Sequence, residues 1–308
     1  MNTKKNKHGV LLTRKELDLL CEGNERVISN RLNKLLDEER SVADKVDKFI
    51  NSLYSEVSAN IKEIVKERRY EMVRTFNGKR LHLSFFPFVC KTPKEEEELL
   101  KTNQQASNCY SLYMDDGQFF RDIVAPVIVV SGKIDIRKFF DDLQHEIEHI
   151  FQQDCIGVAY KNPYLSAHVN SNIYSPEEYK RVPARILYYG NPIEQDAFVN
   201  GLYGYVMTSL KNGLLPVEKN KIEAFIAYRE LCNAYKYLLD NRNNEDFLRE
   251  IQRNYHTKDF HYTYHRLKER GREAISEFEK KISRVLQKCQ DDAAKLGICV
   301  TDTDRWLI

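Results

Sequence analysis

The stretch LQHEIEHIFQQ, residues 143–153, contains His145, Glu146 and His149 in the order H-E-x-x-H. Around it, apolar residues recur at spacings of three, one and four, which predicts a helix with one buried face. The apolar positions of this face are Ile136, Phe139, Phe140, Leu143, Ile147, Ile150 and Phe151. Because the two histidines are four positions apart, they project from the same side of the helix, one turn from each other.

These residue types meet the needs of a catalytic zinc ion. Two imidazoles at this spacing can both bind one tetrahedral metal, and Glu146, rotated by about 100° on the helix, can reach a water on that metal. Zinc lowers the pKa of a bound water toward neutral, and the nearby carboxylate can take that proton and pass it to a leaving amine. The competing interpretation is an amphipathic helix whose polar edge carries His and Glu for no catalytic reason.

A zinc site also needs a third protein ligand. The stretch YYGNPIEQDAFVNGLY, residues 188–203, offers Glu194 near the start of a second helix. Asn191 and Pro192 have the character of an N-cap and a first helical residue, so Glu194 has an alternative role in a capping box. Asp196 is the second choice as ligand, and His168 lies in an irregular stretch with no supporting pattern.

HEIEHIFQ followed by NPIEQDAF resembles the zincin-like zinc metallopeptidases of the gluzincin type, over roughly residues 107–213. The resemblance implies that His145, His149 and Glu194 bind Zn²⁺ and that Glu146 is the general base. It implies that Ala197 is a small position that lets the glutamate helix approach closely. An edge strand within residues 110–130 would then bind a peptide or protein substrate by strand addition. Such enzymes often stabilise the oxyanion with a tyrosine or histidine, for which the candidates are Tyr188, Tyr189, Tyr203 and His168.

The remaining patterns predict the secondary structure around this core. Residues 24–74 carry apolar side chains mostly three and four apart without Gly or Pro, which predicts a long helix that packs on its own domain or pairs with another chain. Strands are predicted at residues 81–90, 110–114 and 123–130. Pro126 favours an edge position or a bulge for the third of these strands.

Helices dominate the second half of the chain. A short helix is expected to start at Ser175 and to be limited by Pro183. Another should run from Asn191 to near Gly213, and charged helices should follow from Lys219 onward.

This order of elements predicts an α+β fold. We expect a zincin-like core at residues 76–213, with a small mixed sheet, an active-site helix and a glutamate helix. Long helical regions should flank it at residues 1–75 and 214–308.

Composition narrows the function classes. The 308 residues include 48 basic and 46 acidic side chains, so a net charge of +2 gives no indication of a nucleic-acid or membrane partner. The seven scattered cysteines argue against a disulfide framework and a cysteine-rich zinc site, and favour a reduced, cytoplasmic setting. We find no signal peptide, and the longest apolar run, residues 123–130, is too short for a membrane-spanning helix.

Other interpretations stay open at this point. Glu146 and His149 form the E-x-x-H unit of di-iron bundles, but no other histidine has a Glu three residues before it. His261 and His265 are also four apart, without an adjacent carboxylate base. The main alternative to a peptidase is a non-catalytic helical interaction protein, in which a degenerate zincin core is the scaffold. Its long helices would bind a partner protein or form an oligomer.

Overall fold

The structure is a computed structural model. It describes residues 4–5, 11–12, 44–92, 94–95, 110–115, 118–156, 171–254, 260–298 and 307. The chain divides into two compact units, Met1–Leu53 and Tyr54–Ile308. In the first unit, β1 (Lys4–Lys5) pairs antiparallel with β2 (Leu11–Leu12), and residues 44–53 are helical. The sheet, the other helices and the candidate site belong to the second unit, and the predicted domain boundaries at residues 75 and 213 remain predictions.

The long helix predicted over residues 24–74 is wrong at its C-terminal end. Helical structure turns at Asn60, resumes as α3 (Ile61–Glu67) and stops where Arg68 adopts a left-handed conformation with φ 59°. The strand β3 (Tyr70–Phe76) follows, with burial that alternates along it. The alternation was missed because several residues of this strand are charged and have good helix propensity. The part of the prediction that covers residues 24–43 lies outside the described residues.

The sheet is small and mixed. β3 and β4 (Lys79–Cys90) form an antiparallel hairpin through a turn at Asn77 and Gly78, whose φ values are 48° and 74°. β6 (Gln118–Val130) lies parallel to β4, and β5 (Tyr110–Asp115) pairs antiparallel with β6. β7 (Lys133–Ile134) also pairs with β6, so the strand order is β3-β4-β6-β5 with β7 off this path. The three predicted strands are confirmed.

Pro126 does not place its strand at an edge of the sheet. β6 has β4 on one side, with Pro126 opposite Phe86, and β5 and β7 on the other. Among the described strands, however, β5 covers β6 only up to Ile123 and β7 only from Val129. Proline therefore falls where β6 is paired on one side only, which fits a residue that has no N–H to donate.

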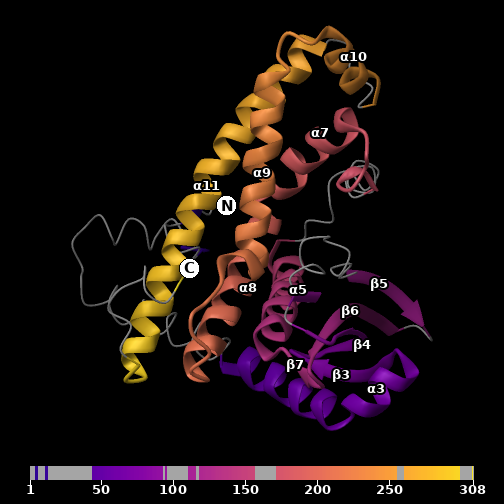
Figure 1. The fold of residues 1–308 in the computed structure, drawn as a ribbon, viewed down its shortest axis with the longest axis vertical. Coiled ribbons are helices and arrows are strands. Elements are labelled where there is room, and N and C mark those ends of the chain that lie inside the picture. The colour runs from indigo at the N-terminus through magenta and orange to yellow at the C-terminus, as the bar shows by residue number, and fades with distance from the viewer. Residues whose placement is uncertain are drawn as a thin grey trace. The chain divides into compact units, whose positions relative to one another are not determined.

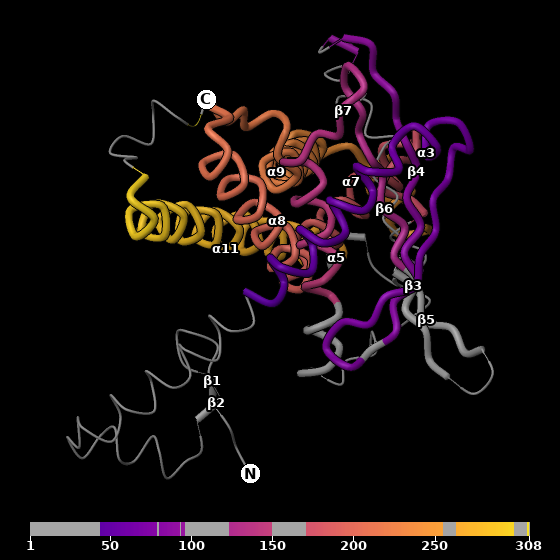
Figure 2. Tube along the Cα trace, turned by 90° about the horizontal axis from the view of Figure 1, so that it is seen from below, coloured from indigo at the N-terminus to yellow at the C-terminus, as the bar shows by residue number. Residues whose placement is uncertain are grey.

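Most of the other described residues of the second unit are helical, which confirms the α+β class (Figure 1). Their bounds are α5 (Ile136–Ile156), α7 (Glu178–Tyr189), α8 (Pro192–Lys211), the 3₁₀ turn η1 (Lys219–Lys221), α9 (Glu223–Asp240), α10 (Glu245–Asn254) and α11 (Phe260–Lys295). α5 packs against β6 on one side and α8 on the other, and α8 in turn packs against α11 (Figure 1 and Figure 2).

Pro183 does not limit its helix, contrary to the prediction. It lies inside α7, which continues to Tyr189. Pro183 is buried together with Val182, Ala184 and Ile186. Burial of these side chains favours the helix and opposes the roughly 3 kcal/mol that an interior proline costs.

α5 and α8 approach closely because small residues line their contact. Ala197 is fully buried, as the predicted small position on the glutamate helix. A Cβ atom at Gly201 would lie 2.4 Å from Oδ1 and 2.9 Å from the carbonyl oxygen of Asp141, and one at Gly204 would lie 2.8 Å from the Gln144 amide. At Gly201 the close atoms include the backbone of α5, whereas at Gly204 they belong to the Gln144 side chain.

We expect Gly201→Val to lower the free energy of unfolding by about 1–3 kcal/mol, because the larger side chain forces α5 and α8 apart. Urea denaturation measures this loss. The matched control is Asn200→Val, at the neighbouring half-buried position of the same helix. An equal loss in both variants would show that the residue introduced, and not the helix contact, is responsible.

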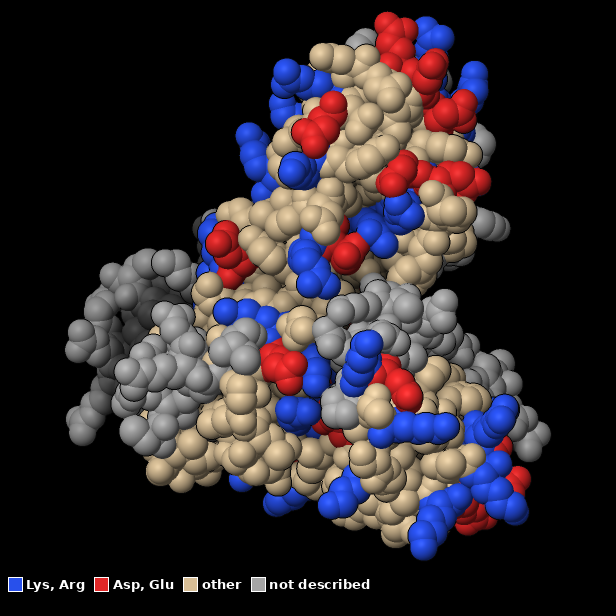
Figure 3. All heavy atoms as spheres, in the orientation of Figure 1, with Lys and Arg blue, Asp and Glu red and all other residues tan. Residues whose placement is uncertain are grey.

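Two further properties concern the surface and length of the helices. Lys, Arg, Asp and Glu are interspersed over α10 and the adjoining part of α11 on the face shown in Figure 3, without a patch of one sign. No helix within the described residues is long and apolar enough to cross a membrane.

Candidate metal centre

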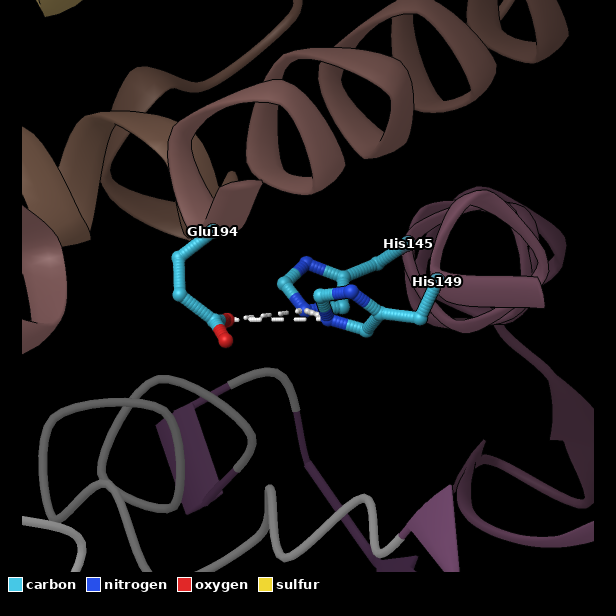
Figure 4. Close-up of side chains that lie close together, drawn as sticks. All are labelled: His145, His149 and Glu194. Carbon is cyan, nitrogen blue, oxygen red and sulfur yellow. Dashed lines mark hydrogen bonds and ion pairs between the residues drawn. The ribbon is translucent and has the colours of Figure 1, made fainter. Parts of the chain in front are cut away.

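α5 presents the two histidines on the side opposite its apolar face. At the start of the helix, Oδ1 of Asp135 accepts the Arg137 N–H at 2.9 Å. Its residues Phe139, Phe140, Leu143 and Ile147 are buried, and the Phe139 ring stacks on Phe85 of β4 at 5.7 Å between centroids. With this face anchored on the sheet, the imidazoles of His145 and His149 project side by side toward α8 (Figure 4).

Asn191 forms the N-cap of α8. Oδ1 of Asn191 accepts the N–H of Ile193 at 3.1 Å, and the Asn191 N–H donates to the carbonyl of Tyr188 at 2.9 Å. The reciprocal bond of a capping box, from the Asn191 N–H to the Glu194 carboxylate, is thus replaced by a backbone bond. The Glu194 carboxylate instead reaches toward the two imidazoles on α5 (Figure 4).

Three ligand atoms converge at this point. Nε2 of His149 lies 3.2 Å from Nε2 of His145, and Oε2 of Glu194 lies 3.6 Å from the first and 3.9 Å from the second. Ligands bound at 2.0–2.2 Å to a tetrahedral zinc ion lie about 3.3–3.5 Å apart. The cluster therefore fits one zinc ion after movements of a few tenths of an ångström, and its His₂Glu donor set is one that catalytic zinc uses.

His145 is held in the form that binds metal. Burial, and to a smaller extent the neighbouring His149, lower its pKa to about 3, while Glu194 opposes the shift. The imidazole is therefore neutral at physiological pH, which is the state required of a metal ligand. Its ring packs edge-on against Phe198 at 4.7 Å between centroids, and no described residue accepts or donates a hydrogen bond at its Nδ1.

Glu146 lies beside the cluster without belonging to it. Its Oε1 is 3.9 Å from Nε2 of His145, and the side chain is buried. The group of converging ligand atoms consists of His145, His149 and Glu194. This is the arrangement expected of a carboxylate that acts on a ligand of the metal instead of on the metal itself.

The other residues singled out from sequence lie elsewhere or at the margin. Asp196 forms an ion pair with Lys281 of α11 at 2.6 Å, and the Tyr203 hydroxyl donates to Asp292 at 3.0 Å. Burial raises the pKa of Tyr188 well above its usual value, and the negative charges of Glu194 and, less strongly, Glu146 add to this effect. His168 and the side chain of His261 lie outside the described residues.

A second buried polar cluster adjoins the histidine helix and was not predicted. Nζ of Lys138 lies 3.2 Å from Asp141, 2.5 Å from Asp142 and 3.7 Å from Glu223. Asp141 also accepts the backbone N–H of Glu223 at 3.3 Å, which links α5 to the first residue of α9. A lysine followed by acids three and four positions later was the only local sign of this cluster, because Glu223 is distant in sequence.

The charges in this cluster balance only in part. Burial disfavours the charged form of Lys138, but attraction to Asp141, Asp142 and Glu223 outweighs it and raises the lysine pKa well above its usual value. Burial raises the pKa of Asp141 and, more strongly, of Asp142, while Lys138 opposes both shifts. The lysine ammonium lies among the three carboxylates, where a metal cation would otherwise bind. Because Glu223 belongs to α9 and the other three residues to α5, the cluster holds these two helices together.

Comparison of the chain with protein-family models, with curated proteins and with solved structures gives no significant match. The case for function therefore depends on the geometry of the site.

Proposed function

We propose that the protein is a zinc-dependent metallopeptidase with a zincin-like core, in which His145, His149 and Glu194 hold the metal. The single observation behind the proposal is the convergence of the three ligand atoms at 3.2–3.9 Å, with the Glu146 carboxylate 3.9 Å from one of them. When bound, zinc supplies Lewis acidity that lowers the pKa of a coordinated water and polarises a carbonyl.

Two side chains of the site would carry out proton transfer and stabilise the oxyanion. Glu146 would accept the proton released as water attacks the carbonyl carbon, and would deliver it to the amine nitrogen as the C–N bond breaks. We favour Tyr188 among the tyrosine candidates, because burial raises its pKa and keeps its phenol protonated, and the charges of Glu194 and Glu146 raise that pKa further. A protonated phenol can donate a hydrogen bond to a developing oxyanion.

The sheet offers a place for an extended substrate. β5 stands at one end of the strand order and pairs with β6 on one side only among the described strands. A peptide that added to this edge would be bound through its backbone, which supports the class of substrate proposed. The test is hydrolysis of a generic peptide library by the zinc-loaded protein, with loss of cleavage after chelation and recovery when zinc is restored.

Zinc should also stabilise the fold. At a free concentration 100 times its dissociation constant, a ligand that binds only the folded state stabilises it by about 2.7 kcal/mol. For a chain of this size we expect a rise in melting temperature of roughly 4–5 °C. Differential scanning calorimetry with and without zinc measures the rise, and His149→Ala, which removes a ligand, should abolish it. An equal rise in this variant would place the zinc elsewhere.

A further inference from the structure

The turn that carries Glu194 is tied to the long C-terminal helix α11. Gln195, the next residue, is 1% exposed. Its Nε2 donates one hydrogen bond to the carbonyl of Tyr189 and one to the carbonyl of Ala274, both at 3.0 Å. Tyr189 is the last residue of α7, and Ala274 lies within α11. A single buried amide thus joins the first turn of α8 to two other helices.

A second contact from α11 holds the same turn. Nζ of Lys281 donates to the carbonyl of Pro192 at 3.0 Å and pairs with Asp196 at 2.6 Å. The approach is close, because a Cβ atom added to Gly190 would lie 3.0 Å from the Cβ of Ala274. The residues on both sides of Glu194 are therefore fixed to α11.

The same helix also supports the first histidine. Phe278 of α11 packs against Phe198 of α8 at 6.1 Å between ring centroids, and Phe198 contacts the His145 ring at 4.7 Å. Phe278 is fully buried. A continuous set of contacts therefore runs from α11 to ligands on both α5 and α8.

We propose that α11 positions the third metal ligand, with Gln195 as the main positioning residue and Lys281 as the second anchor. This inference depends on the proposed function, since it concerns the same metal. A glutamate in the first turn of a helix reaches the metal only if that turn keeps its place to within about 0.5 Å. Residues that hold metal ligands in place typically contribute 10–100-fold to metal affinity. The C-terminal helical region would accordingly contribute to metal binding by keeping Glu194 in place.

The test compares metal binding in the full chain and in Gln195→Met, which keeps the length of the side chain but removes the donor. Competition with a chromophoric chelator gives the zinc dissociation constant, and the visible absorption of the cobalt-loaded protein reports coordination geometry. We expect zinc binding about 10–100-fold weaker and an altered cobalt spectrum. The control, Ile251→Ala, removes a buried side chain from α10 and should lower the melting temperature while leaving affinity and spectrum unchanged.

Lys281→Met provides a second test at a half-buried position, in case Gln195→Met does not fold. We expect it to weaken zinc binding several-fold, and Lys281→Arg to restore most of the loss. Wild-type affinity and cobalt spectrum in both Gln195→Met and Lys281→Met, or in Lys281→Met alone if Gln195→Met does not fold, would overturn the inference and leave the proposed function standing. A wild-type chain that binds no zinc would overturn both.

Discussion

Replacing Glu146 by Gln is expected to reduce peptide hydrolysis by about 10²–10⁴-fold while zinc stays bound. The amide keeps the size of the side chain but cannot accept the proton of the attacking water. Because Glu146 lies outside the group of three converging ligand atoms, its neutralisation should not remove the metal. The measurement pairs the rate of cleavage of one peptide with the zinc content of the same sample.

Glu148→Gln is the matched control, since it makes the same chemical change on the same helix at a half-buried position. It should retain most of the activity. Equal activity in Glu146→Gln and the wild type would contradict the assigned role. Stable zinc binding with no hydrolysis of any peptide by the wild type would instead favour the non-catalytic interaction protein considered from the sequence.

The largest effect on stability is expected from Lys138→Met. This change leaves Asp141, Asp142 and Glu223 together in the interior without the ammonium group that neutralises part of their charge. Removing one partner of a buried ion pair typically costs about 3–5 kcal/mol. Urea denaturation should show this loss, whereas Lys133→Met, at an exposed lysine of β7, should change the free energy of unfolding by less than about 0.5 kcal/mol.

The loss in Lys138→Met should depend on pH. Burial already raises the pKa of Asp141 and Asp142, and without the lysine both should rise further. A carboxyl group whose pKa is higher in the folded state favours folding when protonated, so its contribution is present at low pH and lost as the pH rises through the folded value. The deficit should therefore be larger at pH 8 than at pH 5. The same deficit at both pH values would indicate lost packing instead of lost charge.

Local chemistry explains how much of the site could be predicted from sequence. His145 and His149 are one turn apart on one helix, so their convergence follows from spacing alone. Glu194 was ambiguous between ligand and cap, because N-cap geometry depends on where the Asn191 N–H donates, and only the structure gives its bond to Tyr188. Gln195 showed no pattern at all, since its partner Ala274 is far away in the chain.

Predictions of secondary structure from local sequence failed where tertiary contacts opposed the local preference of the residues. The hairpin of β3 and β4 was not predicted, because the charged residues of β3 extend a helical pattern and it was predicted as helix. Pro183 was predicted to end its helix, as proline usually does, but the helix continues past it and the residues around it are buried in the core. The buried polar cluster around Lys138 was not predicted, because an amphipathic helix normally exposes its polar face to solvent. Both the apolar and the polar face of α5 are buried.

The most direct test of the metal site is a crystal structure of the zinc-loaded protein, with diffraction data collected above and below the zinc absorption edge. The account predicts one anomalous peak about 2.0–2.2 Å from Nε2 of His145, Nε2 of His149 and the carboxylate of Glu194. No peak at this position after loading, or a peak bound by other residues, would contradict it.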